Sequence, residues 1–349
     1  MDGVEDYCAF LGRALAAKGT ELRLVRIPWN EGGWIAALKR AQRDCSDGMW
    51  AIVQYTALSW SRHGFPFLAL AVVACLRWRG VRVAVVFHEP HRQKGASLRW
   101  IDRVRGACQD WVIRSLYRSV VKSIFTVPLS TIAWLPENTE RAAFIPIGAS
   151  VAQWIPTSES PRERSAIGVV VVFCLDGMPA LRQQLSDIGE ALRVAAASGA
   201  RFRVVFVGRG TKEAAAEISN VCGHIAVEIS ILGLLSPERL TDTLAGADAM
   251  LCVRGRVNQC RSSVIAGIAC GLPIVAYGGD VEGTPLADAG LMLVPFRDTD
   301  ALGAALYRVI MDSSLSRELR EKSLRVHQKT FSWDSIASAY VDFLKDGEI

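Results

Sequence analysis

The apolar residues of this chain fall into short runs that alternate with amphipathic stretches. Runs rich in Val, Ile and aromatic residues are typical of buried strands, whereas apolar spacings of three or four residues are typical of helices. Residues 3–19 have helical spacing, and strand-like runs follow at 21–27, 49–55, 81–87, 123–127 and 143–148. This alternation predicts a parallel sheet with helices on both faces.

The pattern restarts after a polar, proline-bearing segment, residues 151–166, whose composition predicts a linker. Strand-like runs then alternate with predicted helices at 188–197, 212–221 and 237–244. We therefore predict an α/β chain of two doubly wound, Rossmann-like domains. Their predicted bounds are 1–150 and 167–330, and a C-terminal helix within 331–349 is expected to pack back on the first domain.

The beginning of the chain raises a separate expectation. In a doubly wound domain a glycine-bearing loop normally follows the first strand, yet Gly3 stands only two residues after Met1. The first strand of the N-terminal domain is therefore expected to be missing from this sequence. The reading frame is predicted to begin about 8 to 15 residues upstream, which is room for one apolar strand.

Length and composition agree with a two-domain protein of the cell interior. A chain of 349 residues fits two domains of about 150 each. No apolar run reaches the roughly 18 residues of a membrane span, and the longest, at 65–76, contains Pro66. The nine cysteines include no CxxC pair, which favours free thiols in a reducing cytoplasm.

Charge is distributed unevenly between the two halves. Residues 1–150 hold 20 Lys and Arg against 12 Asp and Glu, whereas residues 151–349 hold 20 against 23. Nine of the ten tryptophans lie within the first 154 residues. A basic, Trp-rich surface suits anionic lipid or an anionic acceptor, and no nucleic-acid partner is expected because no nucleic-acid-binding motif accompanies the charge.

One predicted helical face in the basic half collects five cations. These are Arg99, Arg103, Arg114, Arg118 and Lys122. Such a face is usually only solvated, but here it is also a candidate for holding the protein against anionic lipid. The expected localisation is cytoplasmic, with peripheral contact at the inner face of the membrane as the alternative.

The stretch CRSSVIAGIACGLPIVAYGG, residues 260–279, predicts a buried helix followed by a strand. Ser262 or Ser263 is expected to cap the helix, and Gly271 is expected to end it. The start of this helix then faces the carboxyl edge of the sheet, where ligands of doubly wound domains bind. Free N–H groups and the helix dipole favour an anion there.

Three arginines precede the same helix start, at positions 254, 256 and 261. The guanidinium fork matches phosphate oxygens in a bidentate way. We therefore interpret Arg254, Arg261, Ser262 and Ser263 as a phosphate-binding group. The alternative is that the serine only caps the helix and the arginines are solvated.

The order of several segments resembles family 4 glycosyltransferases of the GT-B fold. In the C-terminal half these segments are SVIAGIACGLPIVA, GGDVEG, AGLMLVPFRDTDALGAAL and FSWDSIASAY, and in the N-terminal half they are GVEDY, VVFHEP and IPIGASV. The resemblance implies two Rossmann-like domains facing a cleft. It further implies a nucleoside-diphosphate-sugar donor held by the second domain and a carbohydrate or lipid-linked acceptor held by the first.

The sequence departs from that family at two places. The family usually carries two glutamates eight positions apart around the helix described above, where this chain has Asn258 and Ala266. The family's basic residues after the first strand of the second domain are also absent, since that turn reads CLDG at 174–177. Arg254 and Arg261 are expected to supply the missing positive charge.

His88 and Glu89 end a predicted strand and are the candidate catalytic residues. A strand-end histidine at the carboxyl edge is placed for a ligand site, although a lone histidine is more often structural. The resemblance implies that the His88 imidazole contacts the donor sugar or phosphate. A zinc motif is not expected in HEPH, because Pro90 would interrupt the helix and Arg92 stands where the second histidine belongs.

Three further residues are assigned to the donor side. Gly3 matches the family's glycine loop, Glu282 matches a position beside the donor sugar, and Arg209 follows a strand where it would meet the nucleotide. The alternatives are a solvated loop carboxylate for Glu282 and a surface turn for Arg209. Asp298 and Asp300 resemble a metal-binding DxD, but they precede a helix and are expected to cap it.

The function expected from these features is a retaining, metal-independent hexosyltransferase without a cofactor. Its donor would be a nucleoside-diphosphate sugar, and its acceptor is not specified by the sequence. Two alternatives stay open: a non-catalytic binding or scaffold protein that keeps the fold, and a GT-B sugar-nucleotide epimerase that converts the donor without an acceptor.

Overall fold

The strands of the computed structural model are the near-continuous apolar runs of the sequence. β2 (Arg82–Phe87) and β8 (Ala249–Cys252) are almost completely buried, as expected where helices cover both faces of a parallel sheet. The structure describes residues 3–345 except 28, 46–47, 62, 89–99, 137–138, 150, 152–166, 226–227, 260 and 280. The chain divides into unit 1, Met1–Ile147 with Ile336–Ile349, and unit 2, Gly148–Ser335.

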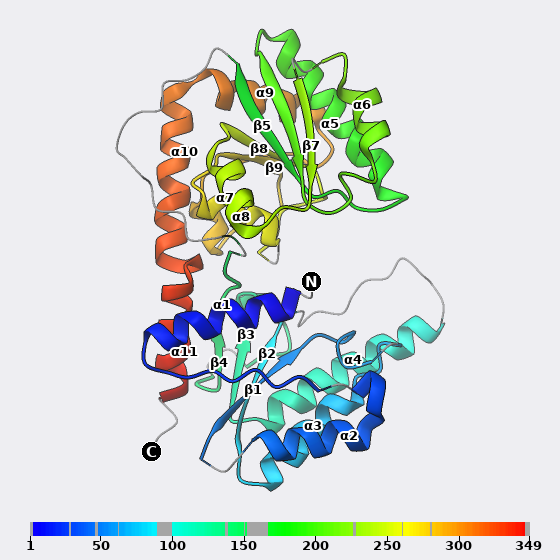
Figure 1. The fold of residues 1–349 in the computed structure, drawn as a ribbon, viewed down its shortest axis with the longest axis vertical. Helices are drawn as coiled ribbons and strands as arrows, with labels where there is room; N and C mark the ends of the chain where they lie inside the picture. Colours follow the sequence, from blue (N-terminus) through cyan, green and yellow to red (C-terminus); the bar gives the residue numbers. More distant parts are fainter. Residues whose placement is uncertain are drawn as a thin grey trace. The chain divides into compact units, whose positions relative to one another are not determined.

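Unit 1 is built on a four-stranded parallel sheet in the order β1-β2-β3-β4, which is also the chain order. Its other strands are β1 (Trp50–Tyr55), β3 (Lys122–Phe125) and β4 (Ala142–Phe144). One face carries α2 (Trp29–Asp44), α3 (Phe67–Trp78) and α4 (Trp100–Ser119), and a 3-10 turn follows β3 at Leu129–Thr131 (Figure 1).

Two helices from opposite ends of the sequence lie together on the other side of this sheet. They are α1 (Gly3–Ala17) and α11 (Trp333–Lys345), which belongs to unit 1 from Ile336 onward (Figure 1). The hydroxyls of Tyr7 and Tyr340 lie 2.7 Å apart and are buried. The C-terminal helix therefore completes the core around α1.

The predicted strand at 21–27 is not formed. Alternating apolar residues predict a strand only where a neighbour accepts its hydrogen bonds, and in the described structure residues 21–26 make no backbone-to-backbone hydrogen bond. Leu24 is about half exposed. The segment connects α1 to α2 and lies along the open edge of β1, as the lining of the cavity described below demonstrates.

The predicted five-residue cationic face is also wrong in part. Lys122 opens β3 instead of continuing the helix, and its ammonium donates to the Glu140 carbonyl at 3.1 Å and lies 4.6 Å from the ring of Phe343. The remaining described members, on α4, are exposed, and Arg99 lies outside the described residues.

Unit 2 is built on a six-stranded parallel sheet in the order β10-β9-β8-β5-β6-β7. Beside β8 its strands are β5 (Gly168–Phe173), β6 (Phe202–Val207), β7 (Glu228–Gly233), β9 (Ile274–Tyr277) and β10 (Leu291–Val294). The chain adds β6 and β7 on one side of β5 and then returns to add β8, β9 and β10 on the other. The strand order therefore reverses between β5 and β8.

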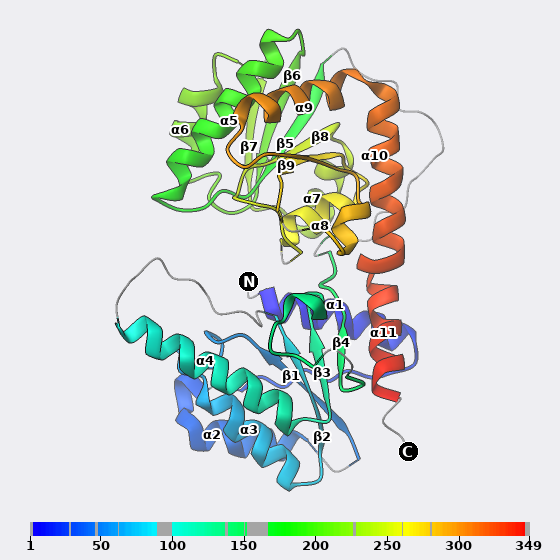
Figure 2. The same ribbon diagram turned by 180° about the vertical axis from the view of Figure 1, so that it is seen from behind.

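Helices cover both faces of the second sheet (Figure 2). One face carries α5 (Ala180–Ala197), α6 (Ala215–Cys222) and α9 (Thr299–Met311), and the other carries α7 (Pro237–Ala245), α8 (Ser262–Ala269) and α10 (Ser313–Val326). A 3-10 turn at Pro285–Asp288 precedes β10, and a π-helical turn at His327–Phe331 joins α10 to α11. The predicted fold class, two parallel-sheet α/β domains, is confirmed, and unit 2 has the doubly wound strand order. The predicted linker lies outside the described residues apart from Val151.

Candidate functional site

The reversal of strand order in unit 2 identifies a candidate ligand site. In open parallel sheets, the loops that leave two neighbouring strands in opposite directions form a crevice at the carboxyl edge. Here the two strands are β5 and β8, which pair directly. The loop after β5 supplies Asp176, and the loop after β8 supplies Arg254.

An ion pair joins these two loops. Asp176 Oδ1 accepts hydrogen bonds from Arg254 Nε at 2.9 Å and from Nη2 at 2.5 Å. The other carboxylate oxygen accepts from Gln184 Nε2 at 2.6 Å, and the Gln184 carbonyl oxygen accepts from the Asp176 backbone N–H at 3.0 Å. Burial favours the neutral acid, but the Arg254 hydrogen bonds outweigh burial, and the pKa of Asp176 falls below its usual value.

Two more arginines shape the loop between β8 and α8. Arg256 donates to the Gly278 carbonyl at 3.0 Å, and its guanidinium lies 4.8 Å from the centre of the Phe296 ring. Arg261 donates through Nε to the Arg256 carbonyl at 3.2 Å. Among the described residues its two terminal nitrogens have no hydrogen-bond partner, so that end of the fork is available to an anion.

The start of α8 differs from the prediction. Arg261 is the N-cap residue and makes no side-chain cap hydrogen bond, whereas Ser262 and Ser263 are the first two helical residues. The prediction that Ser262 or Ser263 caps the helix is therefore wrong, because the cap is the residue before them. Ser262 is exposed and Ser263 is buried. Their N–H groups precede the first intrahelical bonds, so they add to the positive end of the helix dipole.

The end of α8 matches the prediction. Gly271 has φ +62° and follows the C-cap, and a Cβ built there would lie 2.8 Å from Leu324 Cγ of α10. Both the left-handed backbone and the close helix contact therefore require glycine.

Two other predicted donor-side residues, Arg209 and Glu282, also follow strands of unit 2 at this edge. Arg209 follows β6, its carbonyl accepts from the Leu175 N–H at 2.9 Å, and its side chain is exposed. Glu282 follows β9 in an exposed loop and forms no ion pair with the described residues. The structure thus brings together Arg254, Arg261, Ser262 and Ser263.

The two positions matched to the family's glutamates also lie around α8. Ala266 is buried within the helix, and Asn258 is exposed in the loop before it, where its carbonyl accepts from the Arg261 N–H at 3.3 Å. The carboxylate that the structure does place at the switch point is Asp176, on the opposite loop.

In unit 1, His88 directly follows β2 at the carboxyl edge. Its Nε2 lies 2.7 Å from Gln54 Oε1 of β1, and its ring contacts the Tyr7 ring edge-on at 5.1 Å. The His88 carbonyl accepts from the Thr126 hydroxyl at 3.2 Å. Residues of α1 and β1 therefore contact the imidazole, and Thr126, which follows β3, holds the backbone of His88.

The environment keeps this imidazole neutral. Desolvation lowers the pKa of His88 to about 4. With Gln54 Oε1 as the acceptor, Nε2 carries the proton, and Nδ1 is then the lone-pair acceptor. The predicted strand-end position is observed, whereas the second catalytic candidate, Glu89, lies outside the described residues.

Two other predictions concern residues at the N-terminal ends of helices. Gly3 was assigned to a loop, but it is the first residue of α1. Asp298 caps α9, because its carboxylate accepts from the Ala301 N–H at 2.9 Å, which confirms the capping prediction for this part of the DxD sequence. The described residues contain no group of three or more His, Cys, Asp or Glu side chains that could hold a metal ion.

Sequence reasoning missed four residues that organise the two edges. Asp176 and Gln184 hold Arg254, while Gln54 and Tyr7 hold His88. Asp176 carried a usable signal, since it is a charged residue directly after an apolar strand. The partners on helices and on the interior of β1 carried none, because their spacing matches ordinary core positions.

Helix length and hydropathy bear on membrane insertion. No helix within the described residues is both long enough and apolar enough to span a bilayer.

Part of unit 2 matches a known protein family. Residues 171–312 match the family described as glycosyl transferases group 1, a region that contains the loops after β5 and β8 and the whole of α8. No curated protein gives a significant sequence match.

Several solved structures share the fold at low sequence identity. Sucrose-phosphate synthase from Thermosynechococcus elongatus is 17% identical with a TM-score of 0.66, covering 99% of this chain and 93% of its own. A glycosyltransferase from Rickettsia africae ESF-5 is 12% identical with a TM-score of 0.65, at 99% and 94% coverage. HepE of Anabaena, in complex with UDP and glucose, is 10% identical with a TM-score of 0.64, at 99% and 96% coverage. The chain thus has the GT-B fold of two parallel-sheet α/β domains.

Proposed function

We propose that this protein is a glycosyltransferase that moves a sugar from a nucleoside-diphosphate donor to an acceptor, with retention and without a metal. The observation that carries the proposal is the Arg-rich crevice at the β5/β8 switch point, which lies inside the segment matching glycosyl transferases group 1. A basic crevice at a helix N-terminus suits a diphosphate. HepE, which shares the fold, is known in complex with UDP and glucose.

In this proposal the diphosphate lies at the start of α8. The free end of the Arg261 fork and the first-turn N–H groups at Ser262 and Ser263 contact its oxygens. Arg254 is fixed by Asp176 and adds positive charge without needing to reorganise. Preorganised donors of this kind stabilise the charge that develops on a departing diphosphate.

The remaining assignments follow the resemblance. His88 acts in unit 1 as a neutral hydrogen-bonding group that contacts the transferred sugar or a phosphate oxygen, and Glu89, the next residue in the sequence, is the second proposed catalytic residue. Arg209 and Glu282 contact the nucleotide and the donor sugar, and Gly3 lies near the phosphates. We place the protein in a reducing cytoplasm, since the eight described cysteines are free thiols.

We also propose that unit 1, the acceptor-binding unit of this proposal, contacts a membrane surface through the exposed face of α3 and α4. On α4 the exposed side chains of Trp100, Val104 and Trp111 follow one helical stripe that ends in exposed arginines at 114 and 118. The neighbouring α3 exposes Phe67 and Trp78, and the Phe67 and Trp111 rings lie 6.2 Å apart. Exposed tryptophans beside arginines suit an anionic lipid interface.

One experiment tests the sugar-transfer proposal and its alternatives. The protein is incubated with UDP-, GDP-, TDP- and ADP-sugars, and melting temperature, nucleotide release and donor identity are measured. A glycosyltransferase is expected to be stabilised by one nucleotide class and to release the diphosphate. A scaffold protein would release none, and an epimerase would convert the donor sugar without an acceptor.

A vesicle-flotation assay tests the membrane face. Wild-type protein is expected to float with vesicles containing phosphatidylglycerol and to stay in solution with neutral vesicles. Replacing Trp100 and Trp111 by serine should abolish flotation, whereas serine at Trp34, an exposed tryptophan on α2, should not. Equal flotation of both variants would reject this face as the contact surface.

A further inference from the structure

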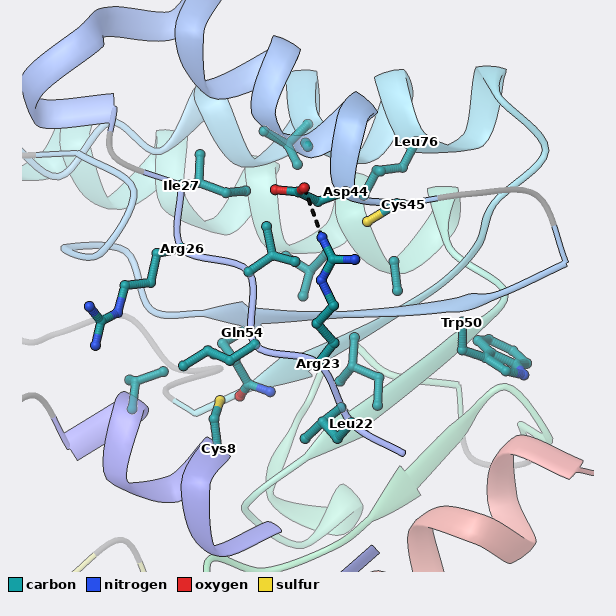
Figure 3. Close-up of a pocket in the computed structure, with 18 of the residues that line it drawn as sticks. Cys8, Leu22, Arg23, Arg26, Ile27, Asp44, Cys45, Trp50, Gln54 and Leu76 are labelled. Atoms are coloured by element: carbon teal, nitrogen blue, oxygen red, sulfur yellow. Dashed lines mark hydrogen bonds and ion pairs between the residues drawn. The ribbon is translucent and has the colours of Figure 1, made fainter. Parts of the chain in front are cut away.

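The outer edge of the unit 1 sheet borders a large cavity. Its volume is about 400 Å³, and apolar side chains from three helices line it, among them Leu11 of α1, Ala41 of α2 and Leu76 of α3. Leu76 is labelled in the close-up of the cavity (Figure 3). Protein cores are close-packed and contain few voids larger than a water molecule. A space of this size next to a sheet is therefore more than a packing defect.

The lining residues indicate the shape of the space. On one wall, residues 50–54 of β1 line it consecutively, and on the other wall, residues 21–27 do the same. Successive side chains of a strand point to opposite faces. A cavity that touches every residue in turn must therefore face the edge of β1, so the space is an open position in the plane of the sheet.

The backbone of β1 has hydrogen-bonding groups that point into this position. The N–H groups of Arg82 and His88 in β2 donate to the carbonyls of Met49 and Tyr55, both at 3.2 Å. Since parallel strands use alternate residues for each neighbour, the N–H groups of Ile52 and Gln54 face the outer edge. No strand pairs with that edge within the described part of the chain.

The opposite wall is held in place by side chains. Arg26 pairs with Glu5 of α1, and Arg23 pairs with Asp44 of α2 at 2.8 Å, the contact drawn in Figure 3. Two ion pairs thus connect this segment to α1 and α2, while the backbone of residues 21–26 bonds to no other backbone group in the described structure. A strand that lay between residues 21–27 and β1 would therefore have a backbone partner on each side.

The start of α1 indicates what fits there. Its first two turns contribute Val4, Glu5 and Cys8 to the lining, and Cys8 lies close to Gln54 near the carboxyl end of β1 (Figure 3). A strand parallel to β1 would end at this same place. It would then pass into α1 through a short connection of the length usual for strand-to-helix loops.

We propose that this position is the seat of a β-strand of the protein itself, formed by residues that directly precede Met1 in a longer form of the chain. The strand would run parallel to β1, pair with β1 on one side and with residues 21–27 on the other, and lead into α1. The unit 1 sheet would then contain six strands and have no open edge at β1. This proposal rests on the cavity and the backbone groups, not on the proposed function.

The test compares the 349-residue chain with a chain extended by the in-frame codons upstream of Met1. Amide hydrogen exchange is followed residue by residue. In the 349-residue chain, the Ile52 and Gln54 amides should exchange at least about 100-fold faster than those of Val53 and Tyr55, which face β2. In the extended chain all four should be protected, and the melting temperature should rise.

Thiol labelling provides a second readout with an internal control. Cys45 lines the cavity, whereas Cys108 lies on α4 away from it. Extension should slow maleimide labelling of Cys45 by about tenfold or more and leave Cys108 unchanged.

Three outcomes would overturn the proposal. One is an in-frame stop codon directly upstream of Met1. Another is an extended chain whose Ile52 and Gln54 amides still exchange as fast as before. The third is protection in the 349-residue chain that grows with protein concentration, which would assign the position to a second copy. Nucleotide binding is unaffected by these outcomes, so failure here is distinguishable from failure of the proposed function.

Discussion

The two units present different chemistry at the carboxyl ends of their parallel strands. In unit 2 the edge is charged: Asp176 and Arg254 form an ion pair across the switch point, and Arg261 stands at the start of α8. In unit 1 the described part of the edge, which here excludes residues 89–99, presents a neutral imidazole: His88 is desolvated and hydrogen-bonded to Gln54 beside the ring of Tyr7. One edge is suited to an anion, and the other to an uncharged hydrogen-bonding partner.

The net charges of the two halves do not match the charges at these two edges. The first 150 residues are basic and the remainder is slightly acidic, yet the basic crevice belongs to the acidic part. The excess arginines of unit 1 include exposed side chains on α4, at 103, 114 and 118. Composition therefore reports on the outer surface of each unit, whereas strand order identifies the site.

The largest expected effect is on the neutral edge. Replacing His88 with alanine should lower turnover by about 100-fold or more, the contribution of one positioned catalytic group. Nucleotide affinity should change much less, because the imidazole acts in the transition state. Turnover and nucleotide binding are measured on one preparation, together with the melting temperature.

The control for this change is His63→Ala, at an exposed histidine of the same unit. It should leave turnover and melting temperature unchanged. A His88→Ala protein that is destabilised but has normal specific activity would show that His88 is a structural residue and would contradict its catalytic role.

The next effect concerns the charged edge. Arg261→Ala should weaken binding of the preferred nucleotide by about 1.5 to 3 kcal/mol, the range for hydrogen bonds to charged groups. The melting temperature without ligand should hardly change, since among the described residues the Arg261 side chain makes a single hydrogen bond, to the Arg256 carbonyl. Calorimetry compares this variant with Arg239→Ala, at an exposed arginine on α7. Equal nucleotide affinities for the two variants would show that Arg261 does not bind the nucleotide.

A comparable effect on stability comes from acid. Desolvation lowers the pKa of both His88 in unit 1 and His327 in unit 2 to about 4, whereas an unfolded histidine titrates near about 6.5. Between these values the unfolded chain binds more protons, so the free energy of unfolding should fall as pH drops from about 6.5 to 4, by roughly 2 to 3 kcal/mol for each histidine. Urea unfolding of His88→Gln and His327→Gln tests this. Each variant should flatten the pH dependence, and an unchanged slope in both would contradict it.

The alternation of apolar runs was enough to predict both parallel sheets, because a buried parallel strand is apolar throughout. It failed at residues 21–27, where the apolar pattern is present but no neighbouring backbone completes the ladder. Strand formation depends on a partner that is remote in sequence, and a local pattern cannot report its absence.

The site was predicted as far as it depends on strand ends. His88, Arg254 and Arg261 each follow a strand or begin a helix, and that position is visible in the sequence. Their partners were not predicted, because Gln184 is held within α5 and Gln54 within β1, at positions that read as ordinary core. The cap of α8 was misassigned because two adjacent serines outweighed the arginine before them.

The smallest expected effect tests whether the C-terminal helix is coupled to unit 1. The Tyr7 and Tyr340 hydroxyls join α1 to α11 at 2.7 Å, and burial raises the pKa of both phenols. Removing one hydroxyl leaves the other as a buried group without this partner, so Tyr7→Phe or Tyr340→Phe should each lower the free energy of unfolding by about 1 kcal/mol. The double variant should lose little more than either single variant, because replacing both partners removes the unsatisfied group. Urea unfolding of the three variants forms a double-mutant cycle, and strictly additive losses would mean that the two hydroxyls contribute independently and that α11 is not coupled to α1 through them.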